Sequence, residues 1–257
     1  MTQGLNTLSK GEGAPLVFQH GLTANIKQTE ALLGGVEDLH LLAIDCPGHG
    51  LSKLPVGSKP TFDWYADEVL GFLNQEGIDQ AIFGGISMGS GIAVNIALRY
   101  PERVKALILV RPAWLDYRDP ENLGILLPAA QLRGEVNGKE RFKSLPEFNK
   151  LKPLAAAQSV LGVFAPEQQP ELAIVIECMV NDRPFESVGE LKDITVPTLV
   201  IGNDDDPLHP ISTAKKVQEN PDNSLQKKVT SRYIENDLHG YQERNLIKNF
   251  IIEHNLY

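Results

Sequence analysis

The fold expected for this chain is decided by one stretch, Gly85-Ile86-Ser87-Met88-Gly89-Ser90-Gly91. The residues before the serine, AIFGG at 81–85, are apolar or small, as a short buried parallel strand requires. The residues after it, IAVNIALRY at 92–100, predict a helix. Ser87 is therefore expected at a tight corner between a strand and a helix. Glycine on either side of such a corner lets the neighbouring backbones approach closely.

A serine at this corner is well placed for chemistry. The spacing G-x-S-x-G is that of a nucleophile elbow, in which the serine hydroxyl is presented at the edge of a sheet. The helix that follows points its free N–H groups toward any anion forming beside the serine, so the N–H of Met88 is a candidate oxyanion donor. The same letters also occur in glycine-rich turns with a capping serine, and it is the flanking strand and helix that favour the catalytic interpretation.

The rest of the chain predicts alternating strands and helices. Compact apolar runs expected to be strands lie at 15–19 (PLVFQ), 41–45 (LLAID), 106–110 (ALILV), 197–202 (PTLVIG) and 228–235. Thr61 caps a predicted helix that ends before Gly77, and further helices are expected at 211–217 and at the end of the chain. This alternation predicts an α/β fold, with a doubly wound, mostly parallel sheet covered on both faces.

The alternation stops between residues 113 and 191, where prolines are scattered and no strand is predicted. We therefore expect a core domain made of residues 1–112 and 192–257, interrupted by a helical lid at 113–191. The bland alternative is that the apolar residues of this segment simply pack it onto the core. A lid over the carboxyl edge of the sheet would exclude water from a site there.

Composition restricts the class of protein. The chain has 257 residues, of which 42% are hydrophobic and 22% charged, as in ordinary globular proteins. No apolar run is long enough to span a bilayer, and MTQGLNTLSK at the start lacks the apolar core of a signal peptide, so a cytoplasmic protein is expected. A net charge of -9 argues against a nucleic-acid partner and mildly disfavours strongly anionic substrates. Cys46 and Cys178 match no disulfide or zinc spacing, and both are expected to be reduced and buried.

Several motifs in a fixed order connect these elements to a known family. They are His20-Gly21 after the first core strand, D-C-P-G-H-G-L-S at 45–52, the Ser87 elbow, the helical segment, the aspartates at 204–206 and His239-Gly240 near the end. The aspartates are expected in a loop at 203–210 and His239 in a loop at 236–240, each after a strand and at the sheet edge that carries Ser87. In this order the chain resembles a lidded α/β-hydrolase-fold enzyme of the esterase, lipase or lactonase type. The resemblance implies a serine hydrolase that cleaves an ester, thioester or related acyl bond through an acyl-Ser87 intermediate.

The resemblance also implies a catalytic triad in the order nucleophile, acid, histidine. Ser87 is the expected nucleophile and His239 the expected base, while the N–H groups of Leu22 and Met88 are the expected oxyanion donors. Counting back from Pro210 favours Asp206 as the acid, whereas counting forward from Gly202 favours Asp205 as the alternative. Asp116, which follows the preceding strand, is a less favoured candidate for the acid. The other histidines are not expected to act as the base. His20 is expected to hydrogen-bond loop backbone and His49 to order the glycine loop, while His40, His209 and His254 are expected to be surface or loop residues.

No metal-ligand spacing and no phosphate-binding loop is present, so neither a metal nor another cofactor is expected. The expected partner is a small-molecule acyl substrate, and the protein is expected to be a monomer or a homodimer. A lactonase, a carbon-carbon bond hydrolase or an acyltransferase could use the same triad, because fold alone does not separate these reactions. The alternative from another class is a non-catalytic member of the fold that binds a ligand or a protein.

Overall fold

The computed structural model describes residues 4–151, 156–219 and 223–257, so the expected core and lid ranges include some residues outside the description. A seven-stranded sheet forms the centre of the chain, in the order β1-β3-β2-β4-β5-β6-β7. Only β1 runs antiparallel to its neighbour among these strands. The strands are β1 (Thr7–Lys10), β2 (Ala14–Gln19), β3 (Leu39–Ile44), β4 (Ala81–Ile86), β5 (Val104–Val110), β6 (Thr198–Asn203) and β7 (Ser224–Val229).

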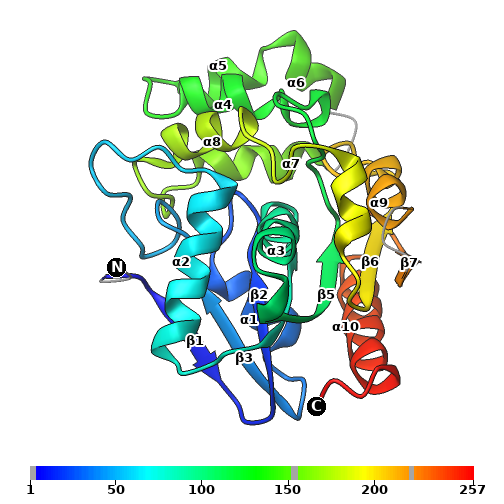
Figure 1. Cartoon of the computed structure of the whole chain (residues 1–257). Coiled ribbons are helices and arrows are strands. Elements are labelled where there is room, and N and C mark those ends of the chain that lie inside the picture. Colours follow the sequence, from blue (N-terminus) through cyan, green and yellow to red (C-terminus); the bar gives the residue numbers. More distant parts are fainter. Residues whose placement is uncertain (1–3, 152–155, 220–222) are drawn as a thin grey trace.

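Helices cover both faces of this sheet (Figure 1). One face carries α2 (Phe62–Gln75), α3 (Met88–Arg99) and α9 (Ile211–Gln218), and the other carries α1 (Ile26–Leu33) and α10 (Asn236–Glu253). Two apolar cores result, one on each side of the sheet. The central strands β2 to β6 are almost fully buried, which is why their sequences are continuous apolar runs rather than alternating patterns. The predicted doubly wound α/β fold is thus confirmed.

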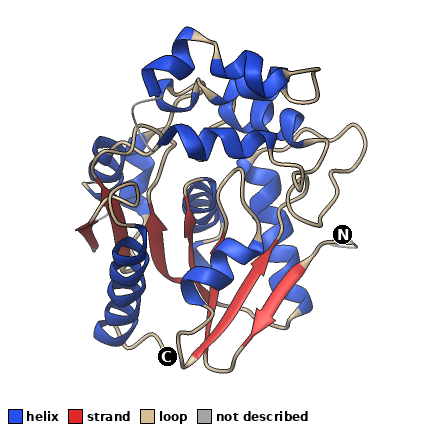
Figure 2. Ribbon diagram, turned by 180° about the vertical axis from the view of Figure 1, so that it is seen from behind, coloured by secondary structure: helices blue, strands red, loops and turns tan. Residues whose placement is uncertain are grey.

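The segment between β5 and β6 contains helices and no strand among its described residues. These helices are α4 (Leu126–Leu132), α5 (Gly138–Lys143), α6 (Pro146–Leu151), α7 (Ala156–Leu161) and α8 (Leu172–Val180). Short 3₁₀ turns lie at Glu121–Leu123, Gly162–Phe164 and Val188–Asp193 here, and another at Pro101–Arg103 follows α3. In Figures 1 and 2 these helices lie together beyond the ends of the parallel strands.

Two predicted element boundaries near the end of the chain were wrong. The last strand, expected at 228–235, is β7 at Ser224–Val229, and residues 230–235 form a loop with one turn at 232–234. The segment 236–240, expected to be a loop, forms the first turn of α10. The charged residues within β7 hid this strand, because it lies at the exposed edge of the sheet and has no apolar run. This shift changes where His239 lies.

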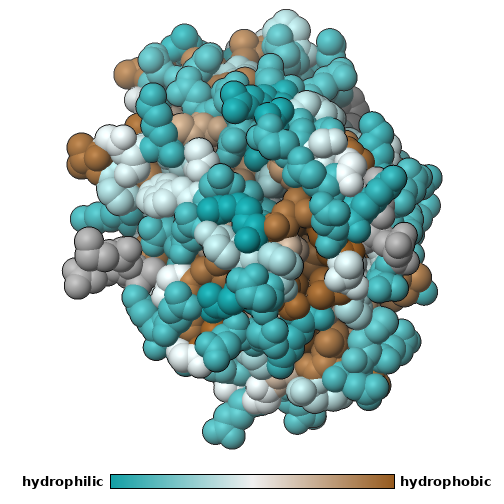
Figure 3. Space-filling model, in the orientation of Figure 1, coloured by the Kyte–Doolittle hydropathy of each residue, from teal (hydrophilic) through white to brown (hydrophobic). Residues whose placement is uncertain are grey.

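The surface of the molecule is mainly hydrophilic, and the two cysteines differ in burial. Hydrophilic residues dominate the face shown in Figure 3, and apolar residues appear there only in limited patches. Within the described residues, no helix combines the length and apolar character that crossing a membrane demands. Cys46 is buried and Cys178 half-buried, and both are free thiols. The expectation that both are buried holds only for Cys46.

Candidate active site

Ser87 lies at the predicted corner between β4 and α3. Its backbone has φ 57° and ψ −111°, a strained conformation for a residue with a side chain, and its N–H donates to the carbonyl of Val110 at 2.9 Å. A Cβ at Gly85 would overlap the backbone of Gly89, and one at Gly89 would overlap the carbonyl of Gln19. Both glycines are therefore required for the close approach that presents the serine hydroxyl.

The imidazole of His209 lies against this hydroxyl. Its Nε2 is 2.9 Å from the Oγ of Ser87, and its Nδ1 is 2.9 Å from the Oδ2 of Asp206. Both residues belong to the loop between β6 and α9, which follows the strand next but one to β4 in the sheet. The three side chains thus form one hydrogen-bonded chain from carboxylate to imidazole to hydroxyl.

Asp206, and not Asp205, occupies the acid position of this chain. Oδ1 of Asp206 accepts from the backbone N–H groups of Leu208 and His209 at 3.2 Å. Burial alone would raise the pKa of the Asp206 carboxyl, but His209, Arg111 and Arg232 together lower it to about 2. The carboxylate is therefore ionised at neutral pH.

The other aspartates lie elsewhere. Asp205 is exposed with a left-handed backbone, φ 58°, and Asp204 forms an ion pair with Lys228. Asp116 accepts a hydrogen bond from the backbone N–H of Val188 at 2.9 Å. None of these three bonds to His209 among the described hydrogen bonds.

The protonation state of His209 suits a base. Burial lowers the pKa of its imidazole, and the cations Arg111 and Arg232 lower it further, against the opposing effect of Asp206. A neutral imidazole with Nδ1–H donating to Asp206 leaves Nε2 free to accept the proton of the Ser87 hydroxyl. The geometry and the charge state therefore agree.

His239 is not at this position, which corrects the expected pairing. Its Nδ1 lies 2.7 Å from the carbonyl oxygen of Thr230, its Nε2 lies 2.8 Å from Oε1 of Glu243, and no described hydrogen bond joins it to Ser87. The physical reason is the early start of α10: a histidine in its first turn faces the core and meets the glutamate one turn later, at i+4. In a loop, as predicted, it would have been free to reach the sheet edge.

Sequence reasoning missed His209 although a local signal was present. His209 lies three residues after the favoured aspartate, in D-P-L-H-P, within a loop already predicted at the carboxyl edge. Similarly, the i+4 spacing of His239 and Glu243 indicates a pair on one helix face. The prediction instead followed the order of motifs in the family that the chain resembles, in which the base is a histidine near the end of the chain.

The loop after β2 borders Ser87 from the other side. A Cβ on Gly21 would lie 3.6 Å from the Cβ of Ser87, and Leu22 lines the same cavity as the serine. The carbonyl of Leu22 is 2.5 Å from Nε2 of His49. His20 accepts from the N–H of Cys46 at 3.0 Å, so the predicted loop-ordering roles of His20 and His49 are confirmed.

Burial keeps His49 neutral and structural. Burial, together with a smaller effect of the nearby His20, lowers the pKa of His49 to about 3. Among the described residues, the N–H groups of Leu22 and Met88 donate to no backbone carbonyl outside the regular elements. As the first residue of α3, Met88 has an N–H with no intrahelical acceptor.

The cavity at Ser87 has a volume of about 290 Å³. It is bounded by the loop after β2, by His209, by two arginines and by residues of the helical segment. Its lining comprises Gly21, Leu22, Thr23, Ala24, Gln28, Ile86, Ser87, Arg111, Trp114, Leu123, Leu126, Ser159, Gly162, Leu208, His209, Arg232 and Tyr233. The cavity is thus small and carries positive charge.

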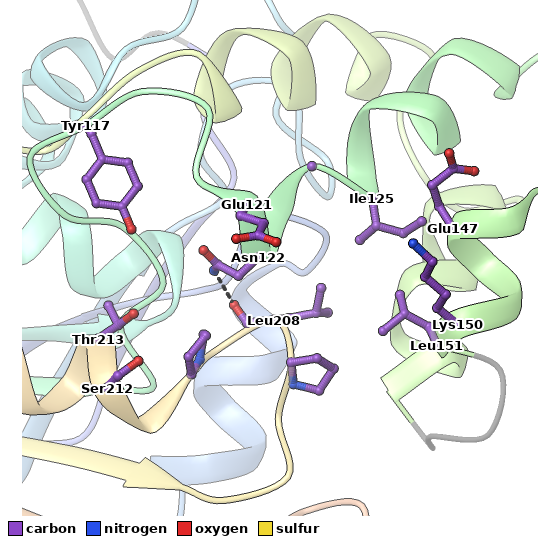
Figure 4. A pocket seen from close by; sticks show the side chains of 13 residues that line it. Tyr117, Glu121, Asn122, Ile125, Glu147, Lys150, Leu151, Leu208, Ser212 and Thr213 are labelled. Carbon is purple, nitrogen blue, oxygen red and sulfur yellow. Dashed lines mark hydrogen bonds between the residues drawn. The ribbon is translucent and has the colours of Figure 1, made fainter.

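A larger cavity of about 620 Å³ lies between the helical segment and the start of α9. Figure 4 shows its lining, with Asn122 donating to the carbonyl of Leu208 at 2.7 Å. Leu208 borders both cavities, so they adjoin at this residue. No histidine is among the described lining residues of the larger cavity, whereas the smaller one contains both Ser87 and His209. Among the described residues, no group of His, Cys, Asp and Glu side chains is arranged to hold a metal ion.

Comparison with known proteins agrees with this fold. The model of the family described as alpha/beta hydrolase fold matches residues 14–155, more than half of the chain. Lipase 3 of Moraxella sp. (strain TA144) is 30% identical over 80% of this chain, and the match spans 67% of the lipase. A 2-(acetamidomethylene)succinate hydrolase of Mesorhizobium japonicum is 28% identical over 77% of this chain and 73% of its own length.

A solved structure has the same fold over nearly the whole chain. The enol-lactonase from Burkholderia xenovorans LB400 superposes with a TM-score of 0.76 and 19% identity, covering 96% of each chain. At this identity the likeness shows the fold alone.

Proposed function

Because this chain belongs to the alpha/beta hydrolase fold family, we propose that it is a serine hydrolase that cleaves a carboxylic ester, thioester or related acyl bond through an acyl-Ser87 intermediate. The observation that carries the proposal is the chain of two hydrogen bonds, each 2.9 Å, from Ser87 to His209 and from His209 to Asp206. A serine hydroxyl becomes a useful nucleophile only when a base takes its proton.

His209 is the proposed base in place of His239. Nε2 of His209 accepts the hydroxyl proton as Oγ of Ser87 attacks the acyl carbon, and then returns the proton to the leaving group. Asp206 holds Nδ1–H and stabilises the imidazolium that forms transiently. In the second half of the reaction, water attacks the acyl-enzyme with His209 again as base, which releases the acid and restores Ser87.

The N–H groups of Leu22 and Met88 are the proposed oxyanion donors. Met88 opens α3, whose N-terminal end favours the developing negative charge, and Leu22 lines the cavity that contains Ser87. His49 bonds the carbonyl oxygen of Leu22 and so helps to hold the loop that carries this N–H. Each donor contributes roughly 3 kcal/mol of transition-state stabilisation.

The helices at 126–180 are proposed as the lid of this site. Trp114, Leu123, Leu126 and Ser159 from the segment 113–191 line the Ser87 cavity, so this segment forms part of the substrate wall. A lid that closes over the cavity would keep water away from the polar groups below it. The lactonase, carbon-carbon hydrolase and acyltransferase alternatives share all of these parts and differ only in the substrate or acceptor.

The proposal is tested with a serine-directed fluorophosphonate probe and with p-nitrophenyl esters from acetate to decanoate. Wild-type protein should be labelled at Ser87 and cleave at least one ester, whereas Ser87→Ala should do neither. Ser212→Ala is the matched control, because Ser212 is an exposed serine on α9 that lines the larger cavity. Folded wild type that is neither labelled nor active would support the non-catalytic alternative.

A further inference from the structure

Two guanidinium groups enter the cavity that contains Ser87. Arg111 follows β5 and Arg232 lies between β7 and α10, and both line the cavity together with Ser87 and His209. Both also line a third cavity, of about 210 Å³ on the α10 side, together with His239, Glu243 and Arg244. Cationic groups therefore border the reactive serine from within an otherwise acidic protein, whose net charge is -9.

Arg111 forms a buried ion pair with Glu243 and still has guanidinium donors without an acceptor. Its side chain is 4% exposed, and its Nε lies 3.3 Å from Oε1 of Glu243. Nε and Nη1 are both buried, and neither has a hydrogen-bond partner among the described residues, so the contact of Nε with Glu243 is an ion pair without a hydrogen bond. A buried donor without an acceptor costs about 1–3 kcal/mol, which a ligand oxygen at this position would recover. The backbone of Arg111 is left-handed, φ 49°, a strained conformation that recurs at ligand sites.

The carboxylate of Glu243 lies between Arg111 and His239 and contacts both side chains. Oε1 of Glu243 also faces Nε2 of His239 at 2.8 Å, and His239 is fixed in turn by the carbonyl of Thr230. Burial alone would raise the pKa of the Glu243 carboxyl, but Arg111 and His239 outweigh burial and lower it, so Glu243 is ionised. Its charge is engaged on the side of α10, away from Ser87.

Arg232 has no acidic partner within the part of the chain that the structure describes. It is half-buried, and its guanidinium lies 5.3 Å from the ring centroid of Tyr233. The nearby carboxylate of Asp206 already accepts from His209 and from two backbone N–H groups. Arg232 is therefore a cation at the cavity wall whose charge no described ion pair neutralises.

We propose that the natural ester substrate also carries a carboxylate group, which binds to Arg111 and Arg232 while its acyl carbon lies at Ser87. The planar donor fork of arginine matches the two oxygens of a carboxylate. The inference rests on the proposed function for the reaction itself: Ser87 displaces the alcohol, and water then releases the acid. It reverses the expectation from overall charge that anionic substrates are disfavoured, because the local charge of the cavity is opposite to that of the molecule.

The test compares charged esters with neutral isosteres. Monoethyl esters of the dicarboxylic acids from succinate to suberate vary the span between acyl carbon and carboxylate, and in each isostere a carboxamide replaces the carboxylate. The acetate ester of 6-hydroxyhexanoate, with its own amide isostere, places the carboxylate on the alcohol half. At least one charged ester should exceed its isostere tenfold or more in kcat/KM. No preference for charge in any pair, in active protein, would overturn the inference.

Arg232→Gln is the first variant, since Arg111 is buried in an ion pair and its replacement can unfold the chain. The ratio of kcat/KM between charged ester and isostere should fall at least fivefold in Arg232→Gln. Arg141→Gln is the matched control: it removes one positive charge from an exposed ion pair with Glu135, away from the cavity, and should keep the ratio. An unchanged ratio in Arg232→Gln would exclude Arg232 from the site.

Binding to Ser87→Ala separates this inference from the proposed function. Calorimetry should show the preferred charged ester binding at least fivefold more tightly than its isostere. If wild type cleaves neutral esters but neither kinetics nor binding favours the carboxylate, the inference fails and the hydrolase stands. If no ester is cleaved but the charged esters still bind selectively, the reaction fails and the carboxylate site stands.

Discussion

Two histidine-carboxylate pairs lie near Arg111, and they differ in the group that the second imidazole nitrogen contacts. His209 and Asp206 are three residues apart in a loop, and the free nitrogen of His209 faces the Ser87 hydroxyl. His239 and Glu243 are one helical turn apart, and the second nitrogen of His239 meets the carbonyl oxygen of Thr230. Pairing with a carboxylate therefore does not identify a base, whereas a free nitrogen at a nucleophile does.

The largest contrast is expected between the two carboxylates. Asp206→Asn should lower kcat for ester hydrolysis about 10⁴-fold, because an amide cannot hold His209 in the required tautomer and stabilise its charge. Glu243→Gln should lower kcat less than tenfold, since Glu243 bonds to no group of the Ser87 chain. Steady-state kinetics with one p-nitrophenyl ester measures both. Equal losses in the two variants would mean that the pairs do not have separate roles.

The second prediction concerns stability on the His239 side. Arg111→Met leaves the Glu243 carboxylate, only 3% exposed, with His239 as its remaining partner. Breaking a buried ion pair on one side should reduce the free energy of unfolding by about 3–5 kcal/mol, measured by urea unfolding. Arg141→Met, which breaks an exposed pair with Glu135, should cost at most about 1 kcal/mol. A loss as small as that of the control would show that the buried pair adds little.

The smallest expected effect is a change in pH dependence. Activity requires neutral His209, so kcat/KM for a neutral ester rises with pH through the pKa of this imidazole. Arg232 lowers that pKa, as does Arg111, and Asp206 raises it. Removing the cation in Arg232→Gln therefore raises the pKa and moves the acid limb of the profile to higher pH. A shift to lower pH, or the same shift in Arg141→Gln, would contradict this electrostatic account.

The sequence predicted the sheet and the elbow because their determinants are local. The apolar runs of β2 to β6 are continuous, since these strands are covered on both faces. The glycines at 85 and 89 are required by the backbones of Gly89 and Gln19. Edge strand β7 has no such run, so the prediction placed it too late in the sequence. As a result, the first turn of α10 was predicted to be a loop.

The choice of histidine could not be made from family order alone. Which histidine reaches Ser87 depends on where α10 begins and on the turn within D-P-L-H-P, and both are set by tertiary packing. The charge of the cavity was equally hidden. Arg111 and Arg232 are 121 residues apart in the chain and are brought together by the adjacent ends of β5, β6 and β7. The net charge of the whole chain is negative, opposite to the charge of the two arginines at the cavity.

The most direct test of the central claim is the rate of Ser87 acylation in His209→Gln and His239→Gln, each shown to be folded by circular dichroism. The burst of p-nitrophenol released in a single turnover measures this rate. The structure predicts a loss of about 10³-fold or more in His209→Gln and less than tenfold in His239→Gln. The reverse order, with His239→Gln inactive and His209→Gln active, would contradict the account and return the role of base to His239.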